Sequence, residues 1–369
     1  MRVHAISAEE HLAYLHTQYS ASFLQTPAWA KVKKEWASRS LGWFDGDELV
    51  GAALVLLRRI PKSTRALAYL PEGPVIDWGT ADLGRWLTPL ASYLKSQKAF
   101  AIRIGPPVVI RTWTAQQIKD GIADPTTETL SDLTPATRPP AGAAVVSQLH
   151  ELGWRRLPSS GGFSAGQPQY NFQIPLVGRT EDDVLRGMNQ LWRRNIKKAA
   201  REGVEIRLGG REDLAAFHTL YAHTAERDHF TPRGPSYFET MWDALSAEDP
   251  DRIRLYLAHH DCDLVASTIW IRVGAHTWYS YGASSTHKRE VRGSNAIQWQ
   301  MIRDSIAAGA SVYDLRGITD TLSSDDAHVG LIQFKVGTGG EAVEYVGEWD
   351  LPLNGLLYKA FLTYLRRRG

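Results

Sequence analysis

The fold of this chain is decided by the stretch "IRLYLAHHDCDLVASTIWIRVGAHTWYSYGAS", residues 253 to 284. Three runs rich in β-branched and aromatic residues, 253–260, 264–273 and 276–284, are separated by short connections at 261–263 and 274–275. Such residues favour strands, and connections this short join antiparallel neighbours. The stretch therefore predicts a three-stranded antiparallel meander.

Helical patterns lie on both sides of this meander. The segment 180–203 predicts one amphipathic helix, with Thr180 as its N-cap and Asp183 completing a capping box. A second helix is expected over 211–230. A third is expected over 294–309, with Ser294 as N-cap and Gly309 past its end, and a last strand follows at 311–318. Helices beside an antiparallel sheet indicate an α+β fold.

The first half of the chain repeats this pattern. The segment 41–60 reads as strand, Asp-Gly-Asp turn and strand, and "RALAYLPEG" adds a third strand. "FDGDELVGAALVL" from Phe44 is weakly similar to "HHDCDLVASTIWI" from His259. The similarity suggests that one α+β unit has been duplicated. The Pro- and Thr-rich segment 112–143 has the composition of a surface insertion in the first unit.

Length and composition narrow the class of protein. With 369 residues, 43% hydrophobic and 22% charged, the chain is expected to be globular with two domains. A net charge of +2 excludes a dedicated DNA binder. The sequence has no apolar run of bilayer length, no signal-peptide pattern at its start, one cysteine (Cys262) and no metal-binding histidine motif. We therefore expect a cytoplasmic protein without a metal.

The basic residues are unevenly distributed along the chain. Such clusters belong either to an ordinary solvated face or to a surface that binds an anionic polymer, and the sequence leaves both readings open. One cluster lies on the helix predicted over 180–203, and the other lies at the C-terminus: Arg193, Arg194, Lys197, Lys198 and Arg201, then Arg366, Arg367 and Arg368.

A single lysine interrupts the apolar run "GLIQFKVGTGG", residues 330–340. The run predicts a strand with Ile332, Phe334 and Val336 on one face and Gln333 and Lys335 on the other. Lys335 is then either a solvated edge residue or a positive charge held for a negative ligand.

Helix pairs against an antiparallel meander are also the pattern of an N-acetyltransferase-type (GNAT) module. These modules hold the coenzyme pyrophosphate on a loop Q/R-x-x-G-x-G/A before a helix. The best match, "REVRGSNA" at 289–296, has Glu290 and Asn295 at two of the key positions. The sequence therefore predicts the fold without the acetyl-CoA loop, and we expect no cofactor.

Eight motifs in series resemble the FemABX family of aminoacyltransferases. They run through almost the whole chain: "FLQTPAWAKVK", "LPEGPVIDW", "RRNIKKAAREGV", "ERDHFTPRGPSYF", "YSYGAS", "GASVYDLRGI", "QFKVGTGG" and "GEWDLPLNGLLYKAF". The resemblance implies two tandem GNAT-like domains with mixed, mostly antiparallel sheets and flanking helices, without the long helical arm of larger members. We expect domains at 1–175 and 176–345, with a tail, 346–369, that returns to the first domain.

The resemblance also implies a reaction and its partners. FemABX enzymes move glycine, alanine or serine from aminoacyl-tRNA to an amino group of residue three of a peptidoglycan stem peptide. The acceptor is UDP-MurNAc-pentapeptide or lipid II, and a lipid-linked acceptor would bring the protein transiently to the membrane surface. We expect a monomer without a DNA partner. The sequence does not decide which amino acid moves, how many are added or which acceptor is used.

Six residues match substrate-binding or catalytic positions of the family. Lys33 matches a lysine on the acceptor's phosphates, and Arg233 and Tyr237 match residues that hold the acceptor. Tyr281 matches a tyrosine of the same channel, and Phe334 is included among the substrate-binding residues. Lys335 matches the lysine proposed to stabilise the transition state. The acid that relatives place before a proline is absent, because Gly105 holds that position.

Two other reactions and one binding role fit parts of the pattern. They are acyl-CoA-dependent N-acyl transfer, aminoacyl transfer from tRNA to a peptide natural product, and non-catalytic binding of RNA or a wall precursor. The defective loop at 289–296 argues against the first. Lys33 and Arg233, which suit a phosphate-bearing acceptor, argue against the second.

Overall fold

The computed structural model describes residues 1–61, 63–158, 166–323, 325–326 and 329–366. By its internal contacts the chain divides into two compact units. Unit 1 comprises Met1–Thr112, Ala136–Gln169 and Glu344–Gly369, and unit 2 comprises Trp113–Pro135 and Tyr170–Val343.

The segment after Thr112 belongs to unit 2, although the sequence suggested an insertion in the first domain. Its backbone is hydrogen-bonded to the later part of the chain, from Ala115 N to Gly340 O at 3.0 Å and from Leu130 N to Asp320 O at 2.8 Å. The C-terminal residues from Glu344 onward group with unit 1.

A seven-stranded sheet forms the centre of unit 1, in the order β1-β2-β3-β4-β5-β15-β7. Neighbouring strands are antiparallel except β4 and β5, which are parallel. The tail contributes β15, which pairs with β5 from Trp349↔Ile104 to Pro352↔Ala101. The strands are β1 (Arg2–Ala5), β2 (Ala37–Asp45), β3 (Glu48–Arg59), β4 (Ala66–Leu70), β5 (Ala99–Ile104), β7 (Arg155–Arg156) and β15 (Trp349–Pro352).

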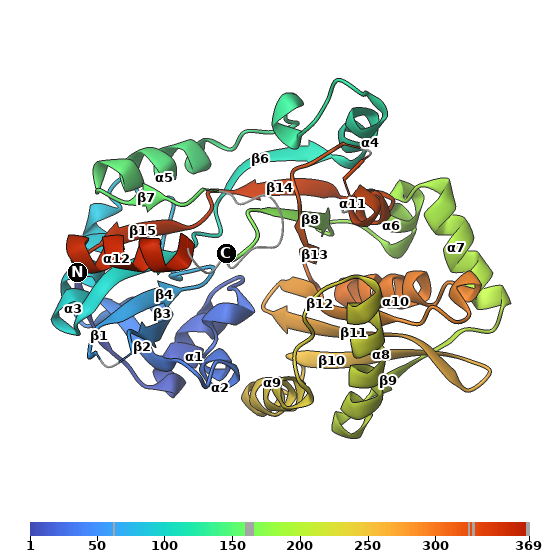
Figure 1. The fold of residues 1–369 in the computed structure, drawn as a ribbon, viewed down its shortest axis with the longest axis horizontal. Helices are drawn as coiled ribbons and strands as arrows, with labels where there is room; N and C mark the ends of the chain where they lie inside the picture. Colours follow the sequence, from blue (N-terminus) through green and yellow to red (C-terminus); the bar gives the residue numbers. More distant parts are fainter. Residues whose placement is uncertain (62, 159–165, 324, 327–328, 367–369) are drawn as a thin grey trace. The chain divides into compact units, whose positions relative to one another are not determined.

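Helices cover the sheet of unit 1 (Figure 1). Helix α1 packs against β2 and β3, and α3 packs against β1 and β5. The core gathers large apolar side chains of both layers, including Trp43, Trp86 and Trp349. The helices are α1 (Ala8–Thr17), α2 (Pro27–Val32), α3 (Gly84–Ser96), α5 (Pro140–Glu151) and α12 (Gly355–Arg366).

Unit 2 is built around an eight-stranded sheet in the order β6-β14-β8-β13-β12-β11-β10-β9. The boundary between the units falls within β6 and β14. The predicted meander is confirmed as β10, β11 and β12. The strands are β6 (Val109–Thr114), β8 (Tyr170–Pro175), β9 (Glu205–Gly209), β10 (Ile253–His260), β11 (Asp263–Val273), β12 (His276–Ser284), β13 (Val312–Ile318) and β14 (Glu341–Tyr345).

The two sheets share one topology. From β1 to β15 in unit 1 and from β9 to β8 in unit 2, three antiparallel pairs are followed by one parallel and one antiparallel pair. The corresponding hairpins turn at Gly46 and at Asp261–Cys262, all with positive φ. This agreement is what duplication of one α+β unit predicts.

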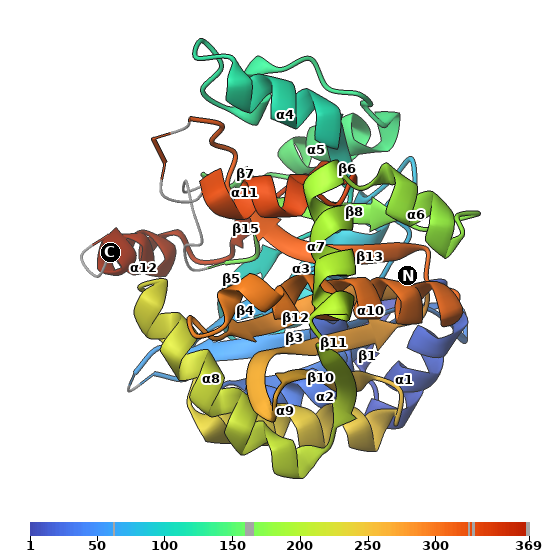
Figure 2. The same ribbon diagram turned by 90° about the vertical axis from the view of Figure 1, so that its right-hand side faces the viewer.

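Helices α8 and α10 lie against the meander of unit 2 (Figure 1). Figure 2 shows α7 beside α10, with α11 and α4 near its other end. The helices are α4 (Ala115–Ala123), α6 (Glu181–Gly187), α7 (Gln190–Arg201), α8 (Leu214–Arg227), α9 (Pro235–Glu248), α10 (Gly293–Ala307) and α11 (Val329–Val336). The longest helix among the described residues is α10, with 15 residues.

Two helix boundaries differ from the prediction. The helix expected over 180–203 is two helices, because Asn189 caps a new one by accepting a hydrogen bond from Trp192 N. Thr180 and Asp183 do form the predicted capping box. Helix α10 begins at Gly293, after Arg292 in a left-handed conformation, so Ser294 is not its N-cap.

Candidate active site

Strands β12 and β13 separate part way along their length. They run parallel and pair over three residues, from His276↔Val312 to Trp278↔Asp314. Beyond that point β12 continues beside β11 as far as Ser284, and β13 continues beside β8. Strands that stop pairing leave backbone groups available to a ligand, so the candidate site is built where β12 and β13 diverge.

Lys335 lies on helix α11, and the predicted strand is wrong. In a strand, Gln333 and Lys335 would share a face, whereas here Gln333 is exposed and Lys335 is only 3% exposed. Helical spacing places Lys335 with Ile332, three residues earlier, in the buried stripe.

The Lys335 ammonium is held by backbone carbonyls of β13. Its Nζ donates to Gly317 O at 2.6 Å and to Arg316 O at 3.3 Å. Burial lowers the pKa of Lys335 to about 7; the charge of Asp314 opposes this change and that of Arg316 adds to it. The group therefore exchanges its proton near neutral pH.

A bulge in β13 creates this carbonyl pair. The register with β8 shifts between Asp314 and Gly317, and Arg316 has a φ of 63°. The carboxylate of Asp314 supports the bend, because Oδ1 accepts a hydrogen bond from Arg316 N at 2.6 Å. A bulge of this kind redirects backbone groups, here toward Lys335.

Asp314 also anchors a buried polar network. Gln173 Nε2 donates to its Oδ2 at 2.9 Å, and His276 Nε2 lies 3.3 Å from the same atom. Burial opposes ionisation of this 1% exposed carboxyl, but His276, Arg316 and Gln173 together hold its pKa below the usual value. A fixed negative charge therefore lies near Lys335 without pairing directly with it.

Two buried polar atoms beside the bulge have no hydrogen-bond partner within the described residues. One is Oδ1 of Asn171, the register partner of Gly317, and the other is Oγ1 of Thr319. Unpaired buried polar atoms are unfavourable unless something bonds to them. They are candidates for hydrogen bonds to a bound substrate.

Three predicted residues form a second part of the same site. The Arg233 guanidinium lies 5.3 Å from the ring centroid of Tyr237, and the hydroxyls of Tyr237 and Tyr281 are 3.0 Å apart. Burial raises the pKa of Tyr281, while the Tyr237 bond and the charges of Arg233 and Arg316 lower it. Tyr281 thus lies within electrostatic reach of both Arg233 and the bulge that holds Lys335. Arg233 lies before α9, which begins at Pro235, whereas Tyr237 lies within the helix.

Phe334 and Lys33 lie in different surroundings. The ring of Phe334 packs on Trp192, with centroids 4.8 Å apart, and Phe334 O accepts a hydrogen bond from Trp192 Nε1 at 2.8 Å. These contacts are those of a packing residue. Lys33 belongs to unit 1, at the end of α2, with Nζ 5.9 Å from the centroid of the Trp29 ring.

A carboxyl group that the sequence did not reveal lies beside Gly105 in unit 1. A Cβ at Gly105 would lie 3.7 Å from Glu348 Cγ. Glu348 Oε1 accepts a 2.5 Å hydrogen bond from Tyr69, and burial raises the pKa of Glu348. The tail therefore supplies an acid close to the position where Gly105 replaces one.

The glycines after Lys335 are explained by packing. A Cβ at Gly337 would lie 2.2 Å from Trp192 Cδ1, and one at Gly339 would lie 2.0 Å from Gly187 O. Gly339 also has a φ of 76°. Protein atoms therefore fill the space beside these glycines, and a substrate does not approach the backbone there.

The described residues show neither a metal-binding cluster nor a membrane-spanning helix. Among the described residues, no group of three or more His, Cys, Asp or Glu side chains could hold a metal ion. Within the same part of the chain, every helix is too short or too polar to cross a lipid bilayer.

Comparisons with known proteins cover nearly the whole chain. The model of the FemAB family matches residues 6–263 and 257–366. The chain is 25% identical to a lipid II:glycine glycyltransferase of Staphylococcus epidermidis, over 96% of this chain and 93% of that protein. It is 24% identical to the enzyme of the same name from Staphylococcus aureus, with the same coverage.

Solved structures share the fold. A crystal structure of FemX aligns over 98% of this chain and 99% of its own, with a TM-score of 0.81 and 23% identity. The C-terminal domain of a putative lysylphosphatidylglycerol synthetase from Agrobacterium fabrum aligns with a TM-score of 0.52 and 11% identity. At these identities the likeness concerns the fold.

Proposed function

The chain belongs to the FemAB family, and from this premise we propose that it is an aminoacyltransferase acting on a peptidoglycan precursor. The donor is aminoacyl-tRNA, and the acceptor is the residue-three amino group of the stem peptide of lipid II or UDP-MurNAc-pentapeptide. The names of the relatives, lipid II:glycine glycyltransferase, support glycine and lipid II as the first substrates to test. We expect a monomer that acts in the cytoplasm, where charged tRNA is made.

One observation carries the proposal: a buried lysine at the point where β12 and β13 diverge. Lys335 is held there by two carbonyls, and Arg233, Tyr237 and Tyr281 follow one another on the adjoining elements. Burying a lysine costs stability, and groups whose pKa is strongly shifted by burial gather at functional sites.

The reaction needs little covalent chemistry from the protein. The ester of aminoacyl-tRNA is already activated, and a neutral amine attacks its carbonyl carbon. The carbon–nitrogen bond forms, negative charge develops on the carbonyl oxygen, and the tRNA 3′ oxygen leaves with the bonding electrons. Holding the two substrates in line and stabilising the charged oxygen are the main contributions of the protein.

Lys335 suits the charged oxygen. Its protonated form donates hydrogen bonds in a site without bulk water. Such a group lowers the activation barrier by on the order of 3 kcal/mol. Because its pKa is about 7, a sizeable fraction of the group is protonated at neutral pH. The departing proton of the amine goes to the leaving oxygen or to solvent in this scheme.

The acceptor contacts follow the family positions. Arg233, with its planar donor fork, suits a phosphate or carboxylate of the acceptor. Tyr237 and Tyr281 offer two linked hydroxyls. Lys33 of unit 1 is assigned to the acceptor phosphates and Phe334 to substrate binding; both assignments rest on the resemblance.

The proposal is tested by mixing purified protein with charged tRNA and acceptor and measuring the mass of the product by mass spectrometry. We expect an acceptor one aminoacyl residue heavier. Panels of charged tRNAs, of UDP-linked and lipid-linked acceptors, and of lysine or diaminopimelate at position three identify the substrates. Acetyl-CoA is the control donor. A product from acetyl-CoA and none from any charged tRNA would overturn the proposal.

A further inference from the structure

Helix α7 carries positive charges that have no counter-charge. Arg194, Lys197 and Lys198 form no ion pair with any described residue. Helical spacing places them with Arg201 along one stripe, and Arg201 has only an exposed contact of 3.4 Å with Glu202. Some other arginines of unit 2 are paired with carboxylates, for example Arg211 with Asp243. The stripe is therefore a locally uncompensated cationic surface.

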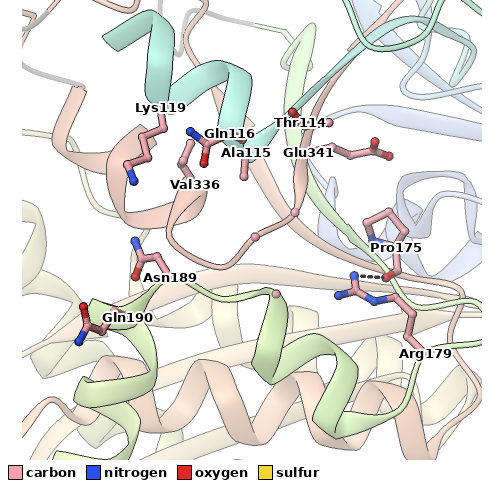
Figure 3. Close-up of a pocket in the computed structure, with 13 residues that line it drawn as sticks. Thr114, Ala115, Gln116, Lys119, Pro175, Arg179, Asn189, Gln190, Val336 and Glu341 are labelled. Atoms are coloured by element: carbon pink, nitrogen blue, oxygen red, sulfur yellow. Dashed lines mark hydrogen bonds between the residues drawn. The ribbon is translucent and has the colours of Figure 1, made fainter. Parts of the chain in front are cut away.

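A cavity of about 580 Å³ lies at the N-terminal end of α7, entirely within unit 2 (Figure 3). Figure 3 shows side chains from α4, α7, β14 and the loop after β8 arranged around it. The volume is in the range of small-molecule pockets.

The chemistry of this cavity suits a nucleotide. Lys119 and Arg179 bring positive charge, and neither forms an ion pair with a described residue. Arg179 is fixed in place by donating to Pro175 O at 3.1 Å and Asp183 O at 3.2 Å. Gln190 adds an amide that can bond a base edge, and Glu341, whose pKa is raised by burial, can bond a ribose hydroxyl.

The cavity and α7 are attached to the segment that carries Lys335. Asn189 N donates to Gly337 O at 2.9 Å, and Trp192 Nε1 donates to Phe334 O at 2.8 Å. These bonds hold both sides of Lys335 to the first turn of α7. Val336, the next residue, lines the cavity. A ligand on α7 is thus bound at a fixed position relative to Lys335.

We propose that α7 and this cavity bind the acceptor end of tRNA, with the 3′-terminal nucleotide in the cavity and backbone phosphates along α7. From Arg194 to Arg201 the helix rises about 10 Å, which matches about three phosphates of one strand. The inference rests on the proposed function, since it places the donor substrate.

The first test measures binding of a fluorescent RNA hairpin that reproduces an acceptor arm ending in CCA, over a series of salt concentrations. A plot of the logarithm of the binding constant against the logarithm of the salt concentration has a negative slope. In Lys197→Gln/Lys198→Gln this slope should become less steep by about 1.5, and binding at low salt should be about tenfold weaker. The matched control is Lys95→Gln/Lys359→Gln, two exposed lysines on helices of unit 1. A slope equal to that of the wild type in the α7 variant would overturn the proposal.

The second test concerns the cavity. Removing the terminal adenosine from the hairpin should weaken binding to the wild-type protein severalfold. In Lys119→Gln the same removal should matter less, and Lys119→Arg should restore the difference. An equal loss in wild type and Lys119→Gln would place the terminal nucleotide elsewhere.

Failure of this inference is distinguishable from failure of the proposed function. If the wild type transfers from charged tRNA and Lys197→Gln/Lys198→Gln has an unchanged KM for tRNA, the placement is wrong and the function stands. If the wild type transfers nothing from any charged tRNA but binds the hairpin through α7, the surface is supported and the function is wrong.

Discussion

Replacing Lys335 by methionine should change the stability of the protein in a pH-dependent way. Methionine has a similar length and no charge. Burial lowers the pKa of Lys335 from 10.5 to about 7. Between these values the unfolded chain keeps the proton while the folded protein releases it, so wild-type stability rises with pH across this window.

The size of the effect follows from the same values. One pKa unit corresponds to about 1.36 kcal/mol. Raising the pH from 7 to 9.5 therefore stabilises the wild type by about 3 kcal/mol relative to a chain without the lysine. The variant also loses the hydrogen bonds of Lys335, and this loss changes its stability by the same amount at each pH. The stability gap between variant and wild type should therefore move by about 3 kcal/mol in favour of the wild type over this range.

Urea unfolding of both proteins at pH 7, 8 and 9.5 measures this gap. Gln333→Met is the matched control, because Gln333 is exposed on the same helix; its gap from the wild type should stay constant. A Lys335→Met gap that is equally constant would mean that the ammonium is solvated in the folded protein, and the reasoning about the site would be refuted.

Three other substitutions give further tests. Tyr237→Phe removes the 3.0 Å contact with the Tyr281 hydroxyl and should raise KM for the acceptor about fivefold with kcat little changed, as steady-state kinetics can check. Gly339→Ala should destabilise the folded protein by more than about 3 kcal/mol, because a φ of 76° and a Cβ 2.0 Å from Gly187 O are both unfavourable. Gly330→Ala is the control, because its Cβ meets open space, and denaturant unfolding compares the two variants. Glu348→Gln should raise Tm at pH 7 but not at pH 4, since the raised pKa disfavours only the ionised form in the folded protein; equal changes at both pH values would contradict this.

The strands of both units could be predicted because their signals are local. Runs of β-branched and aromatic residues, ended by turns at Gly46 and at Asp261–Cys262, specify the hairpins without knowledge of the rest of the chain. The helix break at Asn189 was not predicted, because the helical spacing of apolar residues continues across it. The capping signal of Asn189 extends over only a few residues and is weaker than that pattern.

The site was predicted less completely. The run around Lys335 is apolar on both helical and strand spacing, and short apolar runs do not distinguish the two. The bulge at Arg316 left a signal in "YDLRGI", where an aspartate two residues before a bend can support it. Glu348 left none, because its partner Tyr69 is 279 residues away in sequence.

The most direct measurement is the single-turnover rate of aminoacyl transfer in wild type and Lys335→Met, with both substrates saturating. We predict a rate lower by about two to three orders of magnitude in the variant, with binding of the RNA hairpin and of the acceptor unchanged. A rate within about twofold of the wild type would mean that the Lys335 ammonium does not stabilise the charged intermediate.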